Sequence, residues 1–180
     1  MQHGLNPKKL VFLDETSAKT NMTRLYGRAS IGKRLVDRTP HGHWLTNTYI
    51  CGLRHNRVVA PYAFVGAMNA VRFVEYIEVI LLPTLRRGDI VILDNLPAHR
   101  DSRVKLLIES KGAQVLYLPA YSPDLNPIEL SFSKLKSTLR KLKIRDVDKL
   151  QKFLLESGNL FTKNECKAYF KHNGYTTHKR

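Results

Sequence analysis

The stretches LVFLDE (residues 10–15) and IVILDN (residues 90–95) repeat one pattern, a run of four apolar residues followed directly by an aspartate. A short continuous apolar run is typical of a strand that is covered on both faces. If the two strands are parallel neighbours, their backbones lie about 4.8 Å apart, and Asp14 and Asp94 emerge together at the carboxyl end of the sheet. The alternative is that each aspartate only ends a strand or caps a turn.

Strand and helix patterns alternate along the rest of the chain. Two strand patterns, residues 44–53 and 57–65, predict a hairpin, and Pro61 places the second strand at a sheet edge or at a bulge. Residues 16–43 are polar and basic without periodicity, which indicates a long loop. The later expected elements are a helix over 69–85, a strand over 90–93, a helix over 101–111, a strand over 114–118, helices over 128–144 and 146–156, and a small C-terminal helix. This order predicts an α/β fold with a mixed central sheet of about five strands and helices on both faces.

The chain is strongly basic, because 30 Lys and Arg oppose 15 Asp and Glu in 180 residues. Basic residues that are spread along the chain favour a polyanionic partner; simple solubility is the alternative. Cys51 and Cys166 are far apart and lack metal-site spacing, so we expect buried thiols in a reducing compartment. The sequence contains no apolar stretch suited to a signal peptide or a bilayer span, and we expect a soluble, cytoplasmic protein without a membrane partner.

The segment YLPAYSPDLNPIE (residues 117–129) places three prolines before Glu129. These prolines restrict the backbone and lower the entropy that is lost when Glu129 is fixed as a metal ligand. Asn126, Pro127 and Glu129 also match a helix start with Asn126 as the N-cap and Glu129 in a capping box. Glu129 therefore has both a chemical and a structural role open to it.

The helix that begins there has two sides. The predicted buried stripe consists of Ile128, Phe132, Leu135, Leu139 and Leu142. The adjacent line consists of Glu129, Ser133, Lys136, Arg140 and Lys143. An acid that holds metal, at the head of cations that contact phosphate, suits a nuclease helix; a solvated polar face is the alternative. A second group of cations, Arg28, Lys33, Arg34 and Arg38, predicts a basic loop that contacts DNA or a partner subunit, with a plain solvated loop equally open.

Three motifs resemble a known family: VFLDET (residues 11–16), VILDNLPAHR (residues 91–100) and YLPAYSPDLNPIELSFSKLK (residues 117–136). They are similar to the catalytic domain of DDE transposases, in the bacterial insertion-sequence branch (insertion sequence 630 type) of the Tc/mariner superfamily, over most of residues 8–145. The resemblance implies a ribonuclease-H-like fold. It assigns the catalytic and metal-binding triad to Asp14, Asp94 and Glu129, and the 34 residues between the last two match the spacing that it implies.

The resemblance also implies a reaction. Two Mg²⁺ or Mn²⁺ ions would assist the cutting of DNA at transposon ends, and the freed 3′-hydroxyl would attack a target duplex, typically at a TA dinucleotide. Asn95 and His99 lie in the second motif, which implies an auxiliary role as nearby support or DNA contact. A homodimer is expected in the active complex because two ends must be brought together. The alternatives are a ribonuclease-H-like nuclease that acts on RNA–DNA hybrids and an inactive DNA-binding remnant.

For the domain organisation, we expect a catalytic domain over residues 1–157 and a basic C-terminal helix and tail over residues 158–180. Members of the family usually carry helix-turn-helix modules ahead of the catalytic domain, and only 13 residues precede Asp14 here. We therefore expect end recognition from a separate or fused helix-turn-helix polypeptide. The family also implies a prokaryotic, nucleoid-associated location.

Overall fold

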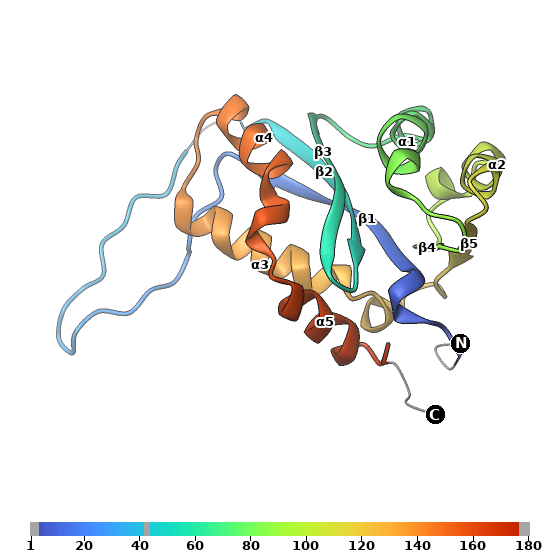
Figure 1. Ribbon diagram of the computed structural model, residues 1–180. Coiled ribbons are helices and arrows are strands. Elements are labelled where there is room, and N and C mark those ends of the chain that lie inside the picture. The colour runs from blue at the N-terminus through green and yellow to red at the C-terminus, as the bar shows by residue number, and fades with distance from the viewer. Residues whose placement is uncertain (1–3, 42–43, 177–180) are drawn as a thin grey trace.

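Figure 1 shows the computed structural model, which describes residues 4–41 and 44–176. Within these ranges, five strands form one sheet in the order β3-β2-β1-β4-β5. The strands are β1 (Leu10–Lys19), β2 (Thr46–Arg54), β3 (Arg57–Val65), β4 (Ile90–Leu93) and β5 (Gln114–Tyr117). The sheet is mixed, as expected: β1 pairs antiparallel with β2 and parallel with β4, and β5 is parallel to β4.

Helices cover both faces of the sheet (Figure 1). The helices are α1 (Ala70–Tyr76), α2 (Ser102–Ser110), α3 (Ile128–Leu142), α4 (Val147–Leu155) and α5 (Lys163–His172). Shorter turns are η1 (Pro7–Lys9), η2 (Ile77–Leu81), η3 (Leu82–Thr84), η4 (Pro97–Arg100), η5 (Pro123–Leu125) and η6 (Ser157–Leu160). Alternate residues of β1 serve the two cores: Leu10 and Phe12 pack with α3, α4 and α5, whereas Val11 and Leu13 pack with α1 and α2. The α/β prediction is confirmed.

The predicted hairpin is confirmed, and both readings of Pro61 are correct. β3 lies at the edge of the sheet, and the register between β2 and β3 shifts beside Ala60 and Pro61. Ala60 adopts a positive φ of 52°, and its carbonyl accepts a hydrogen bond of 2.6 Å from the Tyr76 hydroxyl. The hydrogen bond from Tyr76 of α1 therefore stabilises the bulge, because a carbonyl at a bulge lacks a hydrogen-bond partner on the neighbouring strand.

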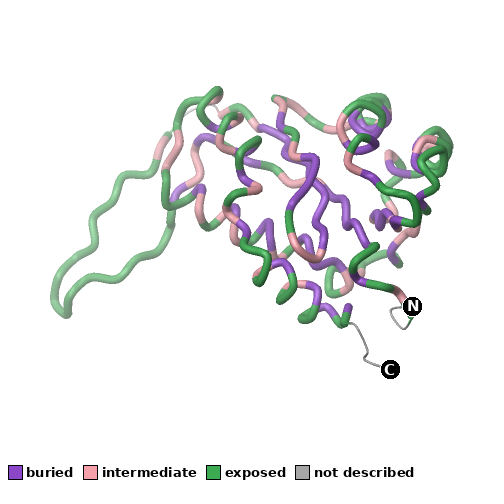
Figure 2. Tube along the Cα trace, in the orientation of Figure 1, coloured by how far each residue is buried: buried purple, intermediate pink, exposed green. Residues whose placement is uncertain are grey.

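Residues 16–19 correct the expected loop, since they extend β1. Every position from Glu15 to Lys19 pairs with β2. Pairing with another strand therefore makes this segment a strand, although its sequence lacks strand periodicity. The loop that follows stays against the body at Thr20 and Thr23, which are buried, and from Arg24 it projects away and is almost entirely exposed (Figures 1 and 2). The expected helix over 128–144 ends at Leu142, because Lys143 turns left-handed with a φ of 52°. Leu142 is 52% exposed, so it does not belong to the buried stripe that was expected to include it.

The C-terminal segment shares the core of the sheet. The Phe12 ring lies 5.3 Å from the Phe170 ring and 4.9 Å from the Tyr175 ring, between centroids. Cys51 and Cys166 are both buried free thiols, as expected. A domain boundary at residue 157 stays a prediction. Within the described ranges, every helix is too short or too polar to cross a membrane.

Candidate active site

The parallel pairing of β1 and β4 brings the first two acids side by side. Leu10 pairs with Ile90 and Phe12 with Ile92, so Asp14 and Asp94 each lie two positions beyond the last pair. β4 ends at Leu93, immediately before Asp94, whereas β1 continues and pairs Asp14 with Cys51 of β2. β1 and β4 are therefore the parallel neighbours that the two apolar runs before Asp14 and Asp94 predict.

Glu129 joins the two aspartates at one cavity of about 370 Å³. It comes from the first turn of α3, whose start follows the proline-rich loop. Asn95, Asn126 and residues 118–123 complete most of the wall. Three carboxyl groups that are far apart in sequence thus share one hollow at the carboxyl end of β4, where ligands of open α/β sheets bind.

Asp14 is the buried member of this group, with 8% of its surface exposed. Its carboxylate accepts hydrogen bonds of 2.8 Å from the Asn126 side-chain amide and 2.7 Å from the Glu15 backbone N–H. Burial raises the pKa of Asp14 to about 7; the Glu15 N–H opposes this shift, and the charges of Glu129 and Asp94 add to it. Ionised Asp14 is therefore disfavoured mainly by its burial, and secondarily by the two carboxylates beside it.

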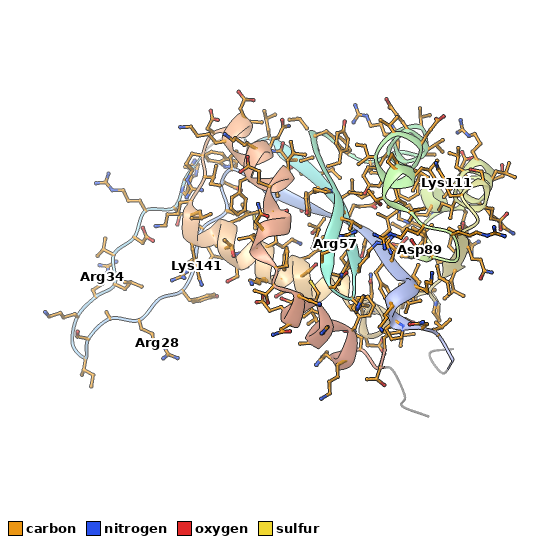
Figure 3. All side chains as sticks on the ribbon, in the orientation of Figure 1. Arg28, Arg34, Arg57, Asp89, Lys111 and Lys141 are labelled. Carbon is orange, nitrogen blue, oxygen red and sulfur yellow. The ribbon has the colours of Figure 1, made fainter. Side chains whose placement is uncertain are left out.

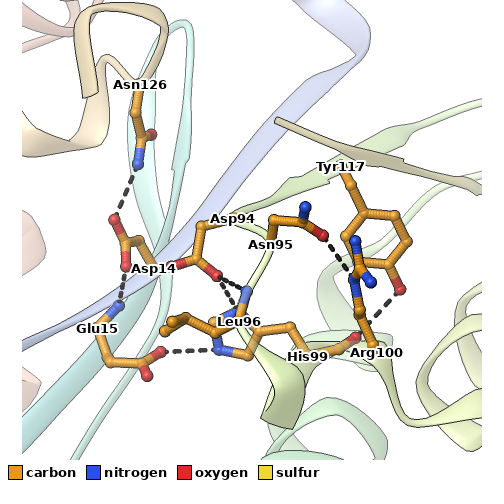
Figure 4. A network of polar contacts seen from close by, with 9 residues as sticks. All are labelled: Asp14, Glu15, Asp94, Asn95, Leu96, His99, Arg100, Tyr117 and Asn126. Atoms are coloured by element: carbon orange, nitrogen blue, oxygen red, sulfur yellow. Dashed lines mark hydrogen bonds and ion pairs between the residues drawn. The ribbon is translucent and has the colours of Figure 1, made fainter. Parts of the chain in front are cut away.

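Asp94 is held by a buried histidine (Figure 4). His99 is completely buried; its Nδ1 contacts Asp94 Oδ1, and its Nε2 lies 3.1 Å from Glu15 Oε2. Burial by itself would lower the pKa of His99, but the hydrogen bonds to Asp94 and Glu15 raise it to about 9. The ring is thus an imidazolium at neutral pH and donates to both carboxylates. The pKa of Asp94 is lowered, because burial, which raises it, is outweighed by His99.

Several contacts fix the position of His99. The ring stacks on Phe73 of α1 with centroids 4.2 Å apart, and the His99 carbonyl accepts from the Tyr117 hydroxyl at 3.1 Å (Figure 4). Asn95, the other auxiliary residue expected from the sequence, lines the acid cavity and accepts a 2.6 Å hydrogen bond from Arg100 Nε. Both auxiliary residues therefore lie at the site, and His99 touches an acid directly.

The start of α3 corrects the expected capping box. The N-cap position falls on Pro127, which makes no side-chain hydrogen bond to the helix start, and the Asn126 side-chain amide donates to Asp14. Sequence reasoning missed this role, and the signal that supports it is the position of Asn126 three residues before a candidate acid.

The end of the chain holds the proline-rich loop in place. The Tyr175 hydroxyl donates to the Leu125 carbonyl at 2.8 Å, and the Asn173 side-chain amide donates to the Asp124 carbonyl. Leu125 directly precedes Asn126, so these bonds support the segment that carries Asn126 and Glu129. The three prolines therefore act together with a tether from beyond α5.

The donor set suits hard divalent cations, which bind carboxylate and amide oxygens. In this conformation, however, no three described His, Cys, Asp or Glu side chains converge closely enough to hold one metal ion. Asp94 uses one carboxylate oxygen for His99 and Leu96. The chemistry of the donors fits Mg²⁺ or Mn²⁺, and a change in side-chain orientation is needed to gather them around an ion.

The expected DNA-contact residues fall into separate places. Lys136 and Arg140 follow Glu129 along α3, but Lys143 pairs with Asp37 of the projecting loop at 2.7 Å, and this contact lowers the pKa of Asp37. Arg28, Lys33 and Arg34 are exposed, and Figure 3 shows Arg28 and Arg34 on that loop, far from the body. The structure thus does not bring these three cations to the acids.

Comparison with known proteins assigns the chain to a family. A family model described as DDE superfamily endonuclease matches residues 9–151. The chain belongs to the DDE superfamily of endonucleases. Among curated proteins, no sequence matches this DDE domain.

Solved structures of Mos1 mariner transposase share the fold of this DDE domain. In the Mos1 strand transfer complex, the match has a TM-score of 0.73 at 20% identity and covers 91% of this chain and 51% of that chain. A mariner Mos1 paired end complex with Mg gives 0.72 at 19% identity, covering 93% and 52%. The catalytic domain of Mos1 mariner transposase alone gives 0.62 at 17% identity, covering 92% and 76%. The DDE domain is therefore ribonuclease-H-like, and the chain spans about half the length of the chains in those complexes.

Proposed function

We propose that this DDE domain is the catalytic domain of a DNA transposase, which cuts DNA at transposon ends and joins the freed 3′-hydroxyl to a target duplex at TA. The observation that carries the proposal is the shared cavity of Asp14, Asp94 and Glu129 on a ribonuclease-H-like sheet. Family membership and the likeness to Mos1 strand transfer and paired end complexes support it. Within the superfamily, we propose the bacterial insertion-sequence branch and a nucleoid-associated location in a prokaryotic cell.

We propose that the three acids hold two Mg²⁺ or Mn²⁺ ions. The Mos1 complexes include one with Mg and one with Mn. When bound, such a pair of ions stabilises the attacking and leaving oxygens of a phosphoryl transfer. The raised pKa of Asp14 supports this assignment, because a cation would relieve the repulsion that Glu129 and Asp94 add to its burial.

The side chains around the acids would orient them. Asn126 donates to one oxygen of Asp14 and leaves a lone pair of that oxygen for a cation. His99 fixes one oxygen of Asp94 and leaves the other free of it. Charged hydrogen bonds of this kind set ligand orientation, which is the usual role of groups behind a metal ligand. We propose the same role for His99 and Asn126.

The proposed partners are DNA, as transposon ends and as target, and a second copy of the chain in the active complex. Lys136 and Arg140 would contact backbone phosphates beside Glu129. We also propose that a helix-turn-helix module, on a separate or fused polypeptide, recognises the ends.

The decisive experiment supplies a pre-cleaved 3′-hydroxyl transposon end and a plasmid target in Mn²⁺, and measures joined product. The Asp94→Asn variant should give no joined product while binding DNA as well as or slightly better than the wild type, because a metal ligand and one negative charge are removed. Asp148→Asn, an exposed change on α4, is the control and should join normally. Undiminished joining by Asp94→Asn would reject the triad, and cleavage of RNA–DNA hybrids without joining would reassign the domain as a hybrid nuclease.

A further inference from the structure

A second hollow lies beside the start of β1, away from the acid cavity. It has a volume of about 520 Å³. We call it the α5 hollow and define it by Lys8, His55, Lys163, Lys167, Lys171 and Tyr175. These residues come from three places: the turn before β1, the β2–β3 turn, and α5 with the segment that follows it. The site therefore depends on the folded arrangement and not on one run of basic sequence.

The hollow concentrates positive charge that the protein leaves uncompensated. Lys163, Lys167 and Lys171 recur at four-residue steps on α5, which places like charges next to one another on one helix face. Among the described residues, no ion pair includes these lysines or Lys8, and the nearby acid of α5, Glu165, pairs with Lys134 instead. Such a stripe destabilises the helix unless an anion binds it.

His55 gives an independent indication that the ammonium groups converge. Burial lowers the pKa of His55, and the charges of Lys167, Lys8 and Lys163 lower it further. Three lysines from two elements therefore act on one half-buried ring. A bound anion would reverse this effect, so His55 can report on occupancy.

We propose that the α5 hollow binds backbone phosphates of DNA. The hollow is concave and presents several ammonium groups, which act as point charges for phosphate oxygens without reading sequence. The identity of the anion as DNA rests on the proposed function, whereas the phosphate-binding chemistry does not.

Ring contacts and hydrogen bonds link the residues of the α5 hollow to the residues around the acid cavity, on the same face of the sheet. Phe12, two residues before Asp14, contacts the rings of Phe170 and Tyr175, which line the hollow. Tyr175 also holds Leu125, next to the Asn126 that donates to Asp14. The residues of the hollow therefore support the elements that carry Asp14 and Asn126.

The test compares two variants that lose the same charge. Lys163→Gln with Lys167→Gln alters the hollow, and Lys149→Gln with Lys152→Gln alters exposed positions on α4. Binding of a short duplex is measured over a series of salt concentrations without divalent metal, so cleavage plays no part. The hollow variant should lower the slope of log Kobs against log[salt] by roughly one to two units, about one per lost phosphate contact. The α4 variant should keep the wild-type slope, and equal slopes in all three proteins, or an equal loss in both variants, would overturn the proposal.

A second measurement separates DNA from a free anion. The His55 ring is followed by NMR, with His55→Gln for assignment, during additions of the duplex and, separately, of inorganic phosphate. A rise in the His55 pKa with duplex, lost in the hollow variant, supports the proposal. A response to inorganic phosphate but none to duplex would overturn it and leave a small-anion site. If duplex binds the hollow but the joining assay fails, the proposed function fails and the phosphate site stands.

Discussion

Replacing Asp14 by asparagine should make the metal-free protein more stable. In the folded protein, burial and the neighbouring carboxylates raise the pKa of Asp14 from its ordinary 3.8 to about 7. This shift means that ionised Asp14 opposes folding by about 4 kcal/mol above neutral pH. The Asn side chain keeps one acceptor oxygen where the carboxylate used two, for Asn126 and for Glu15 N–H. One lost hydrogen bond costs about 1 kcal/mol, so we expect a net gain of about 3 kcal/mol.

The pH dependence has a definite sign. Because the folded pKa is raised, the folded state retains the Asp14 proton between pH 3.8 and about 7, where the unfolded state has lost it. The stabilising contribution of the proton on Asp14 is complete below pH 3.8. It is lost as the pH rises through about 7. The advantage of Asp14→Asn over the wild type should therefore be about 2.6 kcal/mol smaller at about pH 5 than at about pH 8.

The assay is urea unfolding at both pH values in the presence of a chelator, with Asp148→Asn as the control. That change is exposed on α4 and should alter stability by less than about 0.5 kcal/mol at either pH. An Asp14→Asn variant that is no more stable than the wild type at the higher pH, or equally more stable at both pH values, would refute a charge penalty at Asp14.

Three further predictions test other parts of the molecule. Replacing Lys136 and Arg140 by Ala should lower the salt slope of DNA binding by roughly one unit per lost phosphate contact, and an unchanged slope would make this face of α3 a solvated surface. Tyr175→Phe should destabilise the fold by about 1 kcal/mol, because the Leu125 carbonyl loses its donor; faster proteolysis in the proline-rich loop would show that the loop is released, and an unaltered cleavage rate would contradict the tether. Gly52→Ala should cost about 1–3 kcal/mol in urea unfolding, since the added methyl would lie 2.9 Å from Val59 and 3.1 Å from Val11; a neutral effect would show that the strands can separate there.

The parts of the fold that sequence could predict are those decided locally or by strand geometry. The apolar runs before Asp14 and Asp94 each specify a buried strand, and parallel pairing then brings the acids together. Asn69 caps α1, and Thr162 with Glu165 forms the capping box of α5. Each apolar run and each cap depends on residues within a few positions of one another, which is why one sequence suffices to find them.

The parts that sequence could not predict depend on distant partners. Asn126 matches a helix cap, but it donates to Asp14, 112 positions away. Glu15 shows no chemical role in the sequence until folding places it against His99, 84 positions on. Lys143 continues a basic line on α3, yet it pairs with Asp37 across 106 positions. In each case the partner is distant in sequence, and only the tertiary structure supplies it.

The support that residues beyond α5 give to the proline-rich loop bears on how copies of such a domain lose activity. A frameshift or proteolytic cut just before Asn173 would leave all three acids in the chain, yet remove both donors that hold Asp124 and Leu125. A gene survey that counts only intact acids would not register the loss of this support.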